Sequence, residues 1–267
     1  MPLRLTLLAV AVVLAACTRP APAPAPSAMP GPSLSATPSA AAASPSPSSH
    51  RPTPTGIPAS LGGQDFTRIP TTRRIVALTF DAGASADGVA SILATLEREQ
   101  ITATFFLTGD FVRRYPQAAK SLRGHRLGNH TMTHPHLPAL PDAQLRVQVL
   151  DAQDAIRSAT GSDPRPWFRF PYGDSSPGTV QKINALGYVA VRWTVDSLGW
   201  QGTARHSAET VVVRVLDAVA PGQIVLMHVG SNPDDGSTLD ADALPAIIQG
   251  LRARGYAFVT LDALLTP

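Results

Sequence analysis

The chain has 267 residues, with 22 Lys and Arg against 19 Asp and Glu, a formal net charge of +3 and a sequence pI near 9.4. This mildly basic balance, without a cluster of basic residues interleaved with aromatic ones, argues against nucleic acid as a partner. Cys17 is the only cysteine, which excludes an intramolecular disulfide.

The first 17 residues predict an export signal that ends at a lipid-attachment site. Arg4 supplies a short positive region, and the apolar run over residues 5–14 is too short to span a bilayer as a mature helix. The sequence Leu14-Ala15-Ala16-Cys17 resembles the lipobox of bacterial lipoproteins, which implies cleavage before Cys17 and acylation of its thiol. An ordinary cleaved signal peptide with an incidental cysteine and an uncleaved anchor are the alternatives. We expect an exported protein, lipid-anchored to the cell membrane and facing the cell wall.

Residues 18–65 are rich in Pro, Ala and Ser and have almost no large apolar side chains. Such a segment cannot bury enough surface to offset its ordering entropy, so we expect a disordered linker, partly polyproline II. Its extended reach is on the order of 100 Å. Residues 66–267 then form one globular domain, which we expect to be monomeric.

The folded part alternates apolar runs with helical patterns. Strands are predicted at 74–80, 102–107, 126–130, 167–170, 188–194, 223–228 and 257–261, and helices at 87–99, 110–123, 142–160, 178–186, 208–219 and 241–254. Asp110 and Ser207 occupy expected N-cap positions and Pro141 an expected first helical position, and the glycines Gly161, Gly187 and Gly255 follow helix ends. This order predicts an α/β fold, either a barrel or a doubly wound sheet.

Unusual polar residues fall at the carboxyl ends of five of these strands. Asp81 follows the first strand, and the pair His130 and His134 ends the third. Residues 169–173 and 196–200 follow the next two strands, and His228 ends the sixth. In an α/β barrel these ends meet at the face that carries the active site, whereas core packing would scatter the residues along strand interiors. The pattern therefore favours a catalytic role.

Five motifs resemble those of the polysaccharide deacetylase family, the NodB-homology domain of carbohydrate esterase family 4. They are Thr79-Phe80-Asp81-Ala82-Gly83, His130-Thr131-Met132-Thr133-His134, Arg169-Phe170-Pro171-Tyr172-Gly173, Asp196-Ser197-Leu198-Gly199-Trp200 and Leu226-Met227-His228. The resemblance implies a distorted (β/α) barrel of seven strands with the active site at the carboxyl ends of the strands. It also implies metal-dependent removal of N- or O-acetyl groups from polysaccharide.

The resemblance further implies a role for each motif residue. His130 and His134 would bind a divalent metal, with zinc expected and cobalt, nickel or manganese as alternatives. Asp81 would be the general base, Arg169 would hold it ionised, and His228 would protonate the leaving amine. The remaining roles are the backbone N–H of Tyr172 for the oxyanion and Trp200, Leu226 and Pro171 for the substrate pocket.

Each of three roles has a structural alternative. Trp200 could be part of the core, Tyr172 a turn residue and Arg169 a structural ion pair.

Two positions depart from the family pattern. Ala82 stands where the family has an aspartate that is the third metal ligand; Asp87 is the nearest acid downstream, although a helix cap is the favoured interpretation of it. Gly199 stands where the family commonly has an aspartate that tunes the catalytic histidine, and Asp196 could take that part.

The leading hypothesis is an N-deacetylase that acts on cell-wall or related N-acetylated polysaccharide, such as peptidoglycan or chitin-like amino sugars. An O-acetyl esterase of the xylan type is the second hypothesis, and a catalytically impaired glycan-binding lipoprotein, motivated by Ala82 and Gly199, is the third. The acidic segment 234–240 could contact sugar hydroxyls or a metal, although a solvated loop is the preferred interpretation.

Overall fold

The computed structural model describes residues 56–266, so the export signal, Cys17 and most of the predicted linker lie outside the described residues. Within the part assigned to the linker, a 3-10 turn, η1 (Ala59–Leu61), and the strand β1 (Asp65–Phe66) are formed. Leu61 and Phe66 are both buried in one hydrophobic cluster. The folded domain therefore begins several residues before position 66, because these two side chains anchor it.

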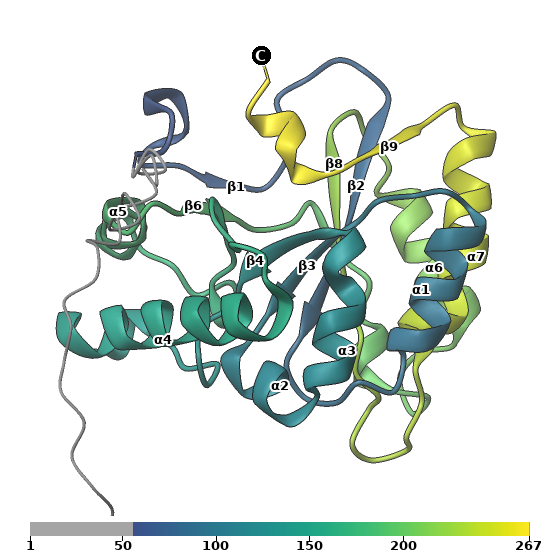
Figure 1. Cartoon of the computed structure of the whole chain (residues 1–267). Coiled ribbons are helices and arrows are strands. Elements are labelled where there is room, and N and C mark those ends of the chain that lie inside the picture. Colours follow the sequence, from purple (N-terminus) through teal and green to yellow (C-terminus); the bar gives the residue numbers. More distant parts are fainter. Residues whose placement is uncertain (1–55, 267) are drawn as a thin grey trace, which may run out of the picture. The chain divides into compact units, whose positions relative to one another are not determined.

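A single sheet of parallel strands curls through the centre of the domain (Figure 1). Its order is β1-β6-β5-β4-β3-β2-β8-β7, and β9 pairs with the start of β2. Arg68, just after β1, forms an antiparallel bridge to Gln223 at the start of β8, which links the two ends of the curled sheet. The remaining strands are β2 (Ile75–Ala82), β3 (Thr104–Leu107), β4 (Arg126–Asn129), β5 (Trp167–Phe168), β6 (Val189–Val191), β7 (Val195–Asp196), β8 (Gln223–His228) and β9 (Ala257–Val259).

The predicted α/β class is confirmed, and all seven predicted strands are present, several of them shorter than predicted. The two additional strands, β1 and β7, have two residues each. Segments this short carry no periodic signal, which is why the sequence pattern did not predict them.

Helices cover the outside of the sheet. They are α1 (Val89–Arg98), α2 (Gly109–Arg114), α3 (Pro116–Ser121), α4 (Asp142–Thr160), α5 (Pro177–Ala185), α6 (Ala208–Asp217) and α7 (Leu239–Ala253), joined by the 3-10 turns η2 (Leu122–Gly124), η3 (Leu137–Ala139), η4 (Pro171–Gly173), η5 (Gly199–Gln201) and η6 (Leu261–Leu264). The helix predicted at 110–123 is divided because Pro116, at the first position of α3, cannot continue α2.

The helix ends show which predicted caps were right. Ser207 caps α6 by accepting a hydrogen bond from the Thr210 N–H, and Gly161 ends α4 in the left-handed conformation. Asp110 is not a cap: Thr108 caps α2, and Asp110 lies in its first turn. Pro141 precedes α4 instead of opening it.

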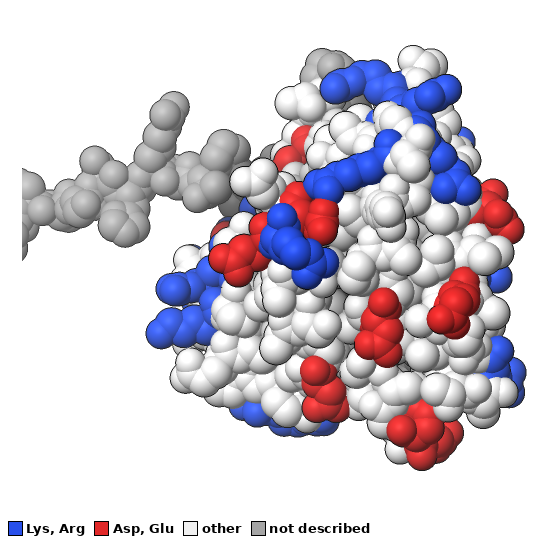
Figure 2. Space-filling view, turned by 90° about the vertical axis from the view of Figure 1, so that its right-hand side faces the viewer, with Lys and Arg blue, Asp and Glu red and all other residues white. Residues whose placement is uncertain are grey.

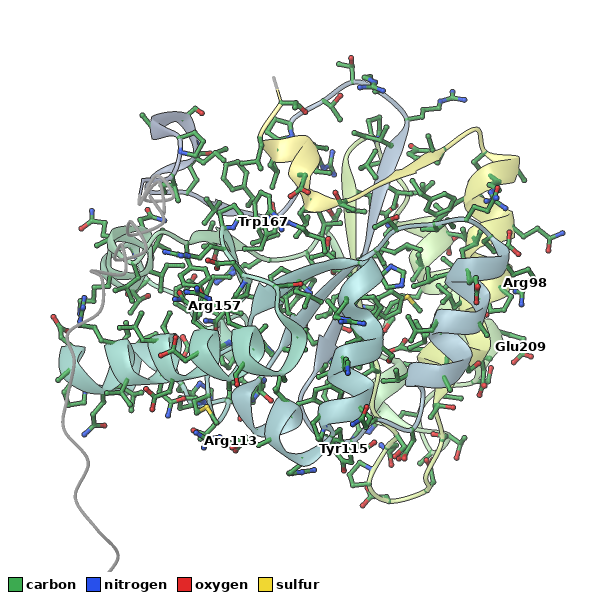
Figure 3. The ribbon with its side chains drawn as sticks, in the orientation of Figure 1. Arg98, Arg113, Tyr115, Arg157, Trp167 and Glu209 are labelled. Atoms are coloured by element: carbon green, nitrogen blue, oxygen red, sulfur yellow. The ribbon has the colours of Figure 1, made fainter. Side chains whose placement is uncertain are left out.

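The two faces of β2 pack into different environments because side chains alternate along a strand. Val76, Leu78, Phe80 and Ala82 belong to the cluster under α1, α6 and α7, whereas Ile75 and Ala77 face the inside of the curl with Trp167. Figure 3 shows Trp167 in the interior and Arg98, Arg113 and Glu209 at the periphery. Thr79 and Asp81 therefore bring polar groups to the inner face.

The surface over α1 and α7 carries charges of both signs. Figure 2 shows basic side chains along the upper edge of this face and separate acidic side chains on its lower half. Within residues 56–266, no helix combines the length and apolar character needed to cross a membrane.

Candidate active site

Polar residues at the carboxyl ends of the strands meet at one edge of the sheet. β2 and β8 are paired so that Asp81 lies beside His228, and β4 ends directly before His130. Arg169 follows β5 and reaches Asp81 with its side chain. Parallel strand order therefore assembles, from four distant segments, the residues that the sequence placed at strand ends.

Asp81 is a buried carboxylate held by a fully buried guanidinium. Its Oδ1 accepts a hydrogen bond from Arg169 Nη1 at 2.8 Å. Burial alone would raise the pKa of Asp81, but the charge of Arg169, supported by His130 and His228, keeps that pKa below its usual value of 3.8. Asp81 is therefore ionised at neutral pH, and Arg169 does not occupy its second oxygen, Oδ2.

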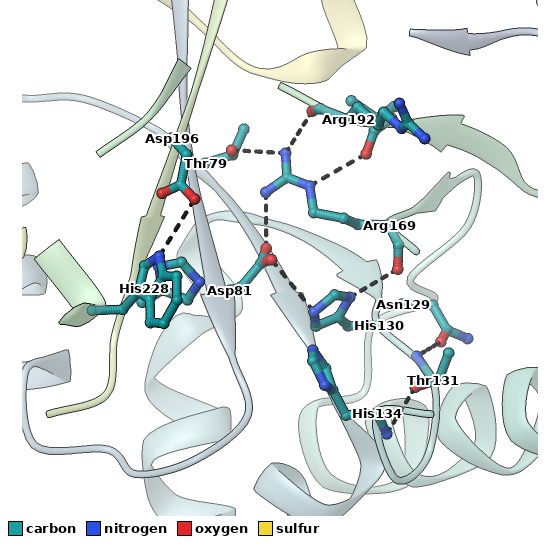
Figure 4. Close-up of polar contacts among 12 residues, drawn as sticks. Thr79, Asp81, Asn129, His130, Thr131, His134, Arg169, Arg192, Asp196 and His228 are labelled. Carbon is teal, nitrogen blue, oxygen red and sulfur yellow. Dashed lines mark hydrogen bonds and ion pairs between the residues drawn. The ribbon is translucent and has the colours of Figure 1, made fainter. Parts of the chain in front are cut away.

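Further contacts fix the guanidinium of Arg169 (Figure 4). Nη2 donates to Thr79 Oγ1 at 2.8 Å and to the Arg192 carbonyl at 3.0 Å, and Nε donates to the Val191 carbonyl at 3.2 Å. The guanidinium carbon lies 4.1 Å from the centre of the Phe106 ring. A planar group held on so many sides has one orientation, and it imposes that orientation on the carboxylate that it binds.

His130 is held in one tautomer by the backbone of Arg169. Its Nδ1 lies 2.8 Å from the Arg169 carbonyl, which can only accept, so Nδ1 carries the hydrogen and Nε2 keeps its lone pair. Nε2 lies 3.4 Å from Asp81 Oδ2. Burial lowers the pKa of His130 in spite of the opposing charge of Asp81. The side chain is therefore a neutral imidazole with a free nitrogen toward Asp81.

A short hydrogen-bonded loop sets His134 beside His130. Asn129 Oδ1 accepts from the Thr131 N–H at 2.9 Å, and Thr131 Oγ1 accepts from the His134 N–H at 3.0 Å. The two imidazole centres are 4.8 Å apart, at an angle of 74°. Burial, and then the charge of His130, lower the pKa of His134 to about 4. Two neutral imidazoles thus stand next to each other.

Backbone strain is concentrated around these residues. Thr131, His134, Tyr172 and Leu198 have φ values of 69°, 61°, 59° and 62°, and they are four of the five non-glycine residues with positive φ in the described part of the chain. Such conformations cost free energy and persist where the surroundings impose them, often at functional sites.

Tyr172 forms an exposed aromatic rim next to His134. Its side chain is 60% exposed, stacks on His136 at 4.1 Å between ring centres, and meets His134 edge-on at 4.5 Å. His136 Nδ1 lies 2.9 Å from Asp174 Oδ2, which steadies the stack. Tyr172 lies in the turn η4, which confirms that it is a turn residue. Its side chain also faces solvent, where a sugar ring could stack on it.

His228 faces a buried carboxylate that no motif predicted. Its backbone N–H donates to Asp240 Oδ2 at 2.8 Å, and its Nδ1 lies 3.6 Å from the same oxygen. Burial alone would lower the pKa of His228, but Asp240, together with Asp81 and Asp196, raises that pKa above the usual 6.5. The pKa values of Asp81 and His228 are thus shifted apart, which favours an ionised base and a protonated acid.

Trp200, which is held by Asp196, lies beside His228 at the edge of the site. Trp200 is 46% exposed, so it is not a core residue, and its ring centre lies 6.3 Å from that of His228. Asp196 binds the Leu198 N–H at 2.9 Å and the Trp200 indole N–H at 3.4 Å. Asp196 therefore holds the Trp200 turn and makes no hydrogen bond to His228.

A cavity of about 430 Å³ opens between these groups. This volume suits a sugar-sized ligand. Leu226 and Pro171, both predicted to line the pocket, are buried outside its lining. The lining includes Asp81, Asp110, His130, His134, Trp200 and His228.

Comparison with known proteins gives a consistent result. The model of the family described as polysaccharide deacetylase matches residues 68–191. A peptidoglycan-N-acetylglucosamine deacetylase of Bacillus cereus is 33% identical over 191 residues, which is 71% of this chain and 67% of the relative. A chitooligosaccharide deacetylase of Sinorhizobium fredii is 35% identical, over 70% of this chain and 89% of the relative. The chain belongs to the polysaccharide deacetylase family.

A solved structure adds a contrast. A carbohydrate esterase family 4 pseudoenzyme from Bacillus anthracis superimposes on this deacetylase with a TM-score of 0.70 and 28% identity, over 77% of this chain and 70% of that chain. The curled sheet is therefore the family fold, and the particular residues at its edge decide what each member does.

The donor atoms of this deacetylase fit a divalent metal, although the set is small. His130 and His134 are neutral, the free Nε2 of His130 faces the Asp81 carboxylate, and all three residues line one cavity. Across residues 56–266, no group of three or more His, Cys, Asp or Glu has the spacing of a complete metal site. Ala82 explains this, because its methyl group is buried in the cluster under the helices and offers no ligand atom.

Asp87 does not complete the set. Its carboxylate accepts hydrogen bonds from Ser85 and Ser231, and the first turn of α1 has no side-chain cap. The interpretation of Asp87 as a helix cap was therefore wrong, and the structure does not group it with the two histidines. Its hydrogen-bond partners are instead Ser85, between β2 and α1, and Ser231, in the loop after β8.

Asp240 contacts His228 and is a site residue that the sequence motifs did not predict. The segment 234–240 was interpreted as a solvated loop, and this holds for Asp235, which binds Thr203, but Asp240 is 3% exposed. A signal was available: Asp240, Leu244, Ile247 and Leu251 have helical spacing and share the buried face of α7. An acidic residue in the first turn of a helix is buried when it lies on the same face as the buried apolar residues, as Asp240 does.

The histidine pair predicts a pH dependence of stability in the metal-free deacetylase. Because folding depresses the pKa of His134 from 6.5 to about 4, the unfolded chain binds more protons between these values. Stability should therefore fall as the pH is lowered from about 6.5 to about 4. We expect His134→Gln to remove about 2 kcal/mol of this fall, allowing for partial exposure, as measured by urea unfolding at several pH values. An unchanged pH slope in His134→Gln would contradict this assignment.

Proposed function

We propose that this deacetylase hydrolyses the N-acetyl groups of amino sugars in cell-wall or related polysaccharide, with peptidoglycan or chitin-like glycans as substrates. The observation that carries the proposal is the pairing of Asp81 and His228 across one cavity, with pKa values shifted in opposite directions. An ionised base and a protonated acid are what amide hydrolysis needs. The names of the two deacetylase relatives support the substrate class.

In the proposed reaction, water adds to the acetyl carbonyl and the carbon–nitrogen bond then breaks. Asp81 accepts a proton from the attacking water, while Arg169 keeps the carboxylate ionised and oriented. The backbone N–H of Tyr172 stabilises the developing oxyanion. His228 donates its proton to the leaving nitrogen, which releases acetate and a free amino sugar.

We propose that His130 and His134 hold a divalent metal, with zinc expected. When bound, the metal supplies a Lewis acid for the acetyl carbonyl and for the attacking water. The chain offers two imidazoles here, and no described residue takes the part of the aspartate absent at Ala82. The support is the neutral state and adjacency of the two rings.

Metal content is expected to depend on this pair. Purified wild-type protein dialysed against excess zinc should retain about one ion per chain, because the two neutral imidazoles would hold the ion and water would complete its shell. His130→Ala should retain almost none, as measured by mass spectrometry of the metal and by calorimetric titration. His125→Ala is the control, because His125 lies at the opposite end of β4 from His130 and accepts a hydrogen bond from the Ala103 N–H. Equal zinc retention in His130→Ala and His125→Ala would refute the site.

Substrate class is tested by acetate release from three polymers side by side. We expect acetate from chitin oligomers and from peptidoglycan, and little from acetylated xylan, because an amine leaving group depends on a protonated acid, the role proposed for His228. Faster release from acetylated xylan would replace the N-deacetylase proposal with the O-acetyl esterase alternative.

One observation favours a second candidate, a catalytically impaired glycan-binding protein. Ala82 lacks the ligand atom of the family pattern, and the pseudoenzyme from Bacillus anthracis shows that the fold exists without activity. Against this reading, the Asp81–Arg169 pair and His228 are retained with shifted pKa values, for which binding alone has no need.

We propose that the protein acts outside the membrane, exported and anchored through a lipid on Cys17. The support is the lipobox-like sequence together with the cell-wall substrates named for relatives. Fractionation of cells that carry Cys17→Ser tests this, since the variant should leave the membrane fraction. Retention of Cys17→Ser in the membrane would refute the lipid anchor.

A further inference from the structure

We propose that Asp240 is the positioning residue of His228, and that its carboxylate stands in the space that a side chain at position 199 would fill. The inference rests on the function proposed above, in which His228 protonates the leaving amine. It assigns to α7 a role that the family pattern places on the turn after β7.

The first support is the set of contacts around the carboxylate. Asp240 Oδ2 accepts the backbone N–H of His228 at 2.8 Å and lies 3.6 Å from its Nδ1. Among the described atoms, Asp240 Oδ1 and His228 Nδ1 are both buried without a hydrogen-bond partner. Nδ1 faces Asp240 Oδ2, whose other contact is the His228 backbone N–H, so a proton on Nδ1 would give this buried nitrogen the partner that it lacks.

The second support is the space at Gly199. A Cβ built at this position would lie 2.8 Å from Asp240 Cγ and 3.0 Å from its backbone nitrogen, which is closer than real side chains approach. Gly199 does not have a positive φ, so its backbone would accept another residue. The Asp240 carboxylate makes the closest contacts to a side chain there, and the Asp240 backbone nitrogen adds a tight one.

The third support is that Asp240 is anchored. It opens the buried stripe of α7, which continues through Leu244, Ile247 and Leu251, so the carboxylate cannot swing into solvent without moving the helix. Asp196 is the other acid near the turn, and its two oxygens accept hydrogen bonds from the Leu198 N–H and the Trp200 indole N–H. Asp240 is thus the carboxylate available to Nδ1.

Charged and titratable groups from several elements act on the pKa of His228. Asp81 comes from β2, Asp196 from β7 and Asp240 from α7, and the two imidazoles His130 and His134 come from the loop after β4. Asp81 and Asp196 already have partners of their own. Loss of the Asp240 charge should therefore make His228 easier to deprotonate.

The first experiment compares Asp240→Asn with the control Asp242→Asn, which removes an exposed acid from the same first turn of α7. In Asp240→Asn we expect kcat to fall at least tenfold with KM little changed, and the alkaline limb of the kcat profile to move about one pH unit lower. Asp242→Asn should behave as wild type, which separates the effect from a general effect of charge at the helix end.

The second experiment moves the carboxylate back to position 199. Gly199→Asp alone should impair kcat, because its side chain collides with Asp240. Asp240→Ala alone should also impair kcat. The double variant Gly199→Asp/Asp240→Ala should recover most of the lost kcat and the alkaline limb of the wild type, a rescue that a merely structural role for Asp240 would not produce.

The titration of the His228 imidazole, followed by NMR without substrate, keeps the inference testable if a variant folds poorly. A wild-type pKa at or below 6.5 would overturn it, as would equal His228 titrations in Asp240→Asn and Asp242→Asn, or a double variant no better than Asp240→Ala. If wild-type protein releases no acetate, the proposed function fails, and the NMR titration still decides whether Asp240 controls His228.

Discussion

Asp81→Asn is expected to lower kcat for acetate release by about 10²–10⁴-fold, the usual contribution of a general base. Asparagine has nearly the shape of aspartate, and its amide oxygen can still accept the Arg169 hydrogen bond that now measures 2.8 Å. It cannot accept a proton from water at neutral pH. The measurement is steady-state acetate release from chitin oligomers at saturating substrate.

A matched control removes the same charge elsewhere. Asp151 is exposed on α4, and Asp151→Asn should retain the wild-type rate. Circular dichroism of both variants shows whether the fold is kept. Full activity in a folded Asp81→Asn protein would show that another group is the base.

Loss of the Arg169 cation is expected to lower the stability of the fold strongly. Arg169→Met should reduce the free energy of unfolding by about 3–5 kcal/mol, because it leaves the Asp81 carboxylate buried without its cation. For a domain of this size the melting temperature should fall by roughly 10 °C. Thermal and urea unfolding at pH 7 measure the loss. Lys182→Met, which breaks an exposed ion pair with Asp142, should cost less than about 1 kcal/mol.

A double variant separates charge from packing. In Asp81→Asn/Arg169→Met no charge remains buried at this position, so part of the stability lost in Arg169→Met should return. Thr79 and the Val191 carbonyl still lose their donor, which limits the recovery. If Arg169→Met is no less stable than Lys182→Met, the ion pair does not support the fold.

The fold and the central residues were predictable because both depend on local pattern. Buried parallel strands appear as continuous apolar runs, as in β2, where all eight residues are buried. A polar residue at the end of such a run, as Asp81 is in β2, or directly after it, as His130 is after β4, must lie at the carboxyl edge of the sheet. The order of the strands then decides which of these residues are neighbours. The pairing of Asp81 with His228 follows from the β2–β8 register.

The parts that were missed depend on contacts between distant segments. Asp240 approaches His228 only because α7 packs against the sheet, and Asp87 is bound by Ser231 from another loop. Neither contact leaves a motif in the sequence. The apolar stripe of α7 did indicate that Asp240 would be buried, but it could not indicate that Gly199 would be the space it enters.

We propose that this chain performs amide hydrolysis at the cavity bordered by Asp81 and His228. The most direct test is wild-type acetate release from N-acetylglucosamine oligomers, across a series of divalent metals, with free amine and saccharide binding measured in the same samples. We expect acetate and amine in equal amounts, with release lost on chelation of the metal. Saccharide binding without acetate under every metal would contradict it and establish a binding protein instead.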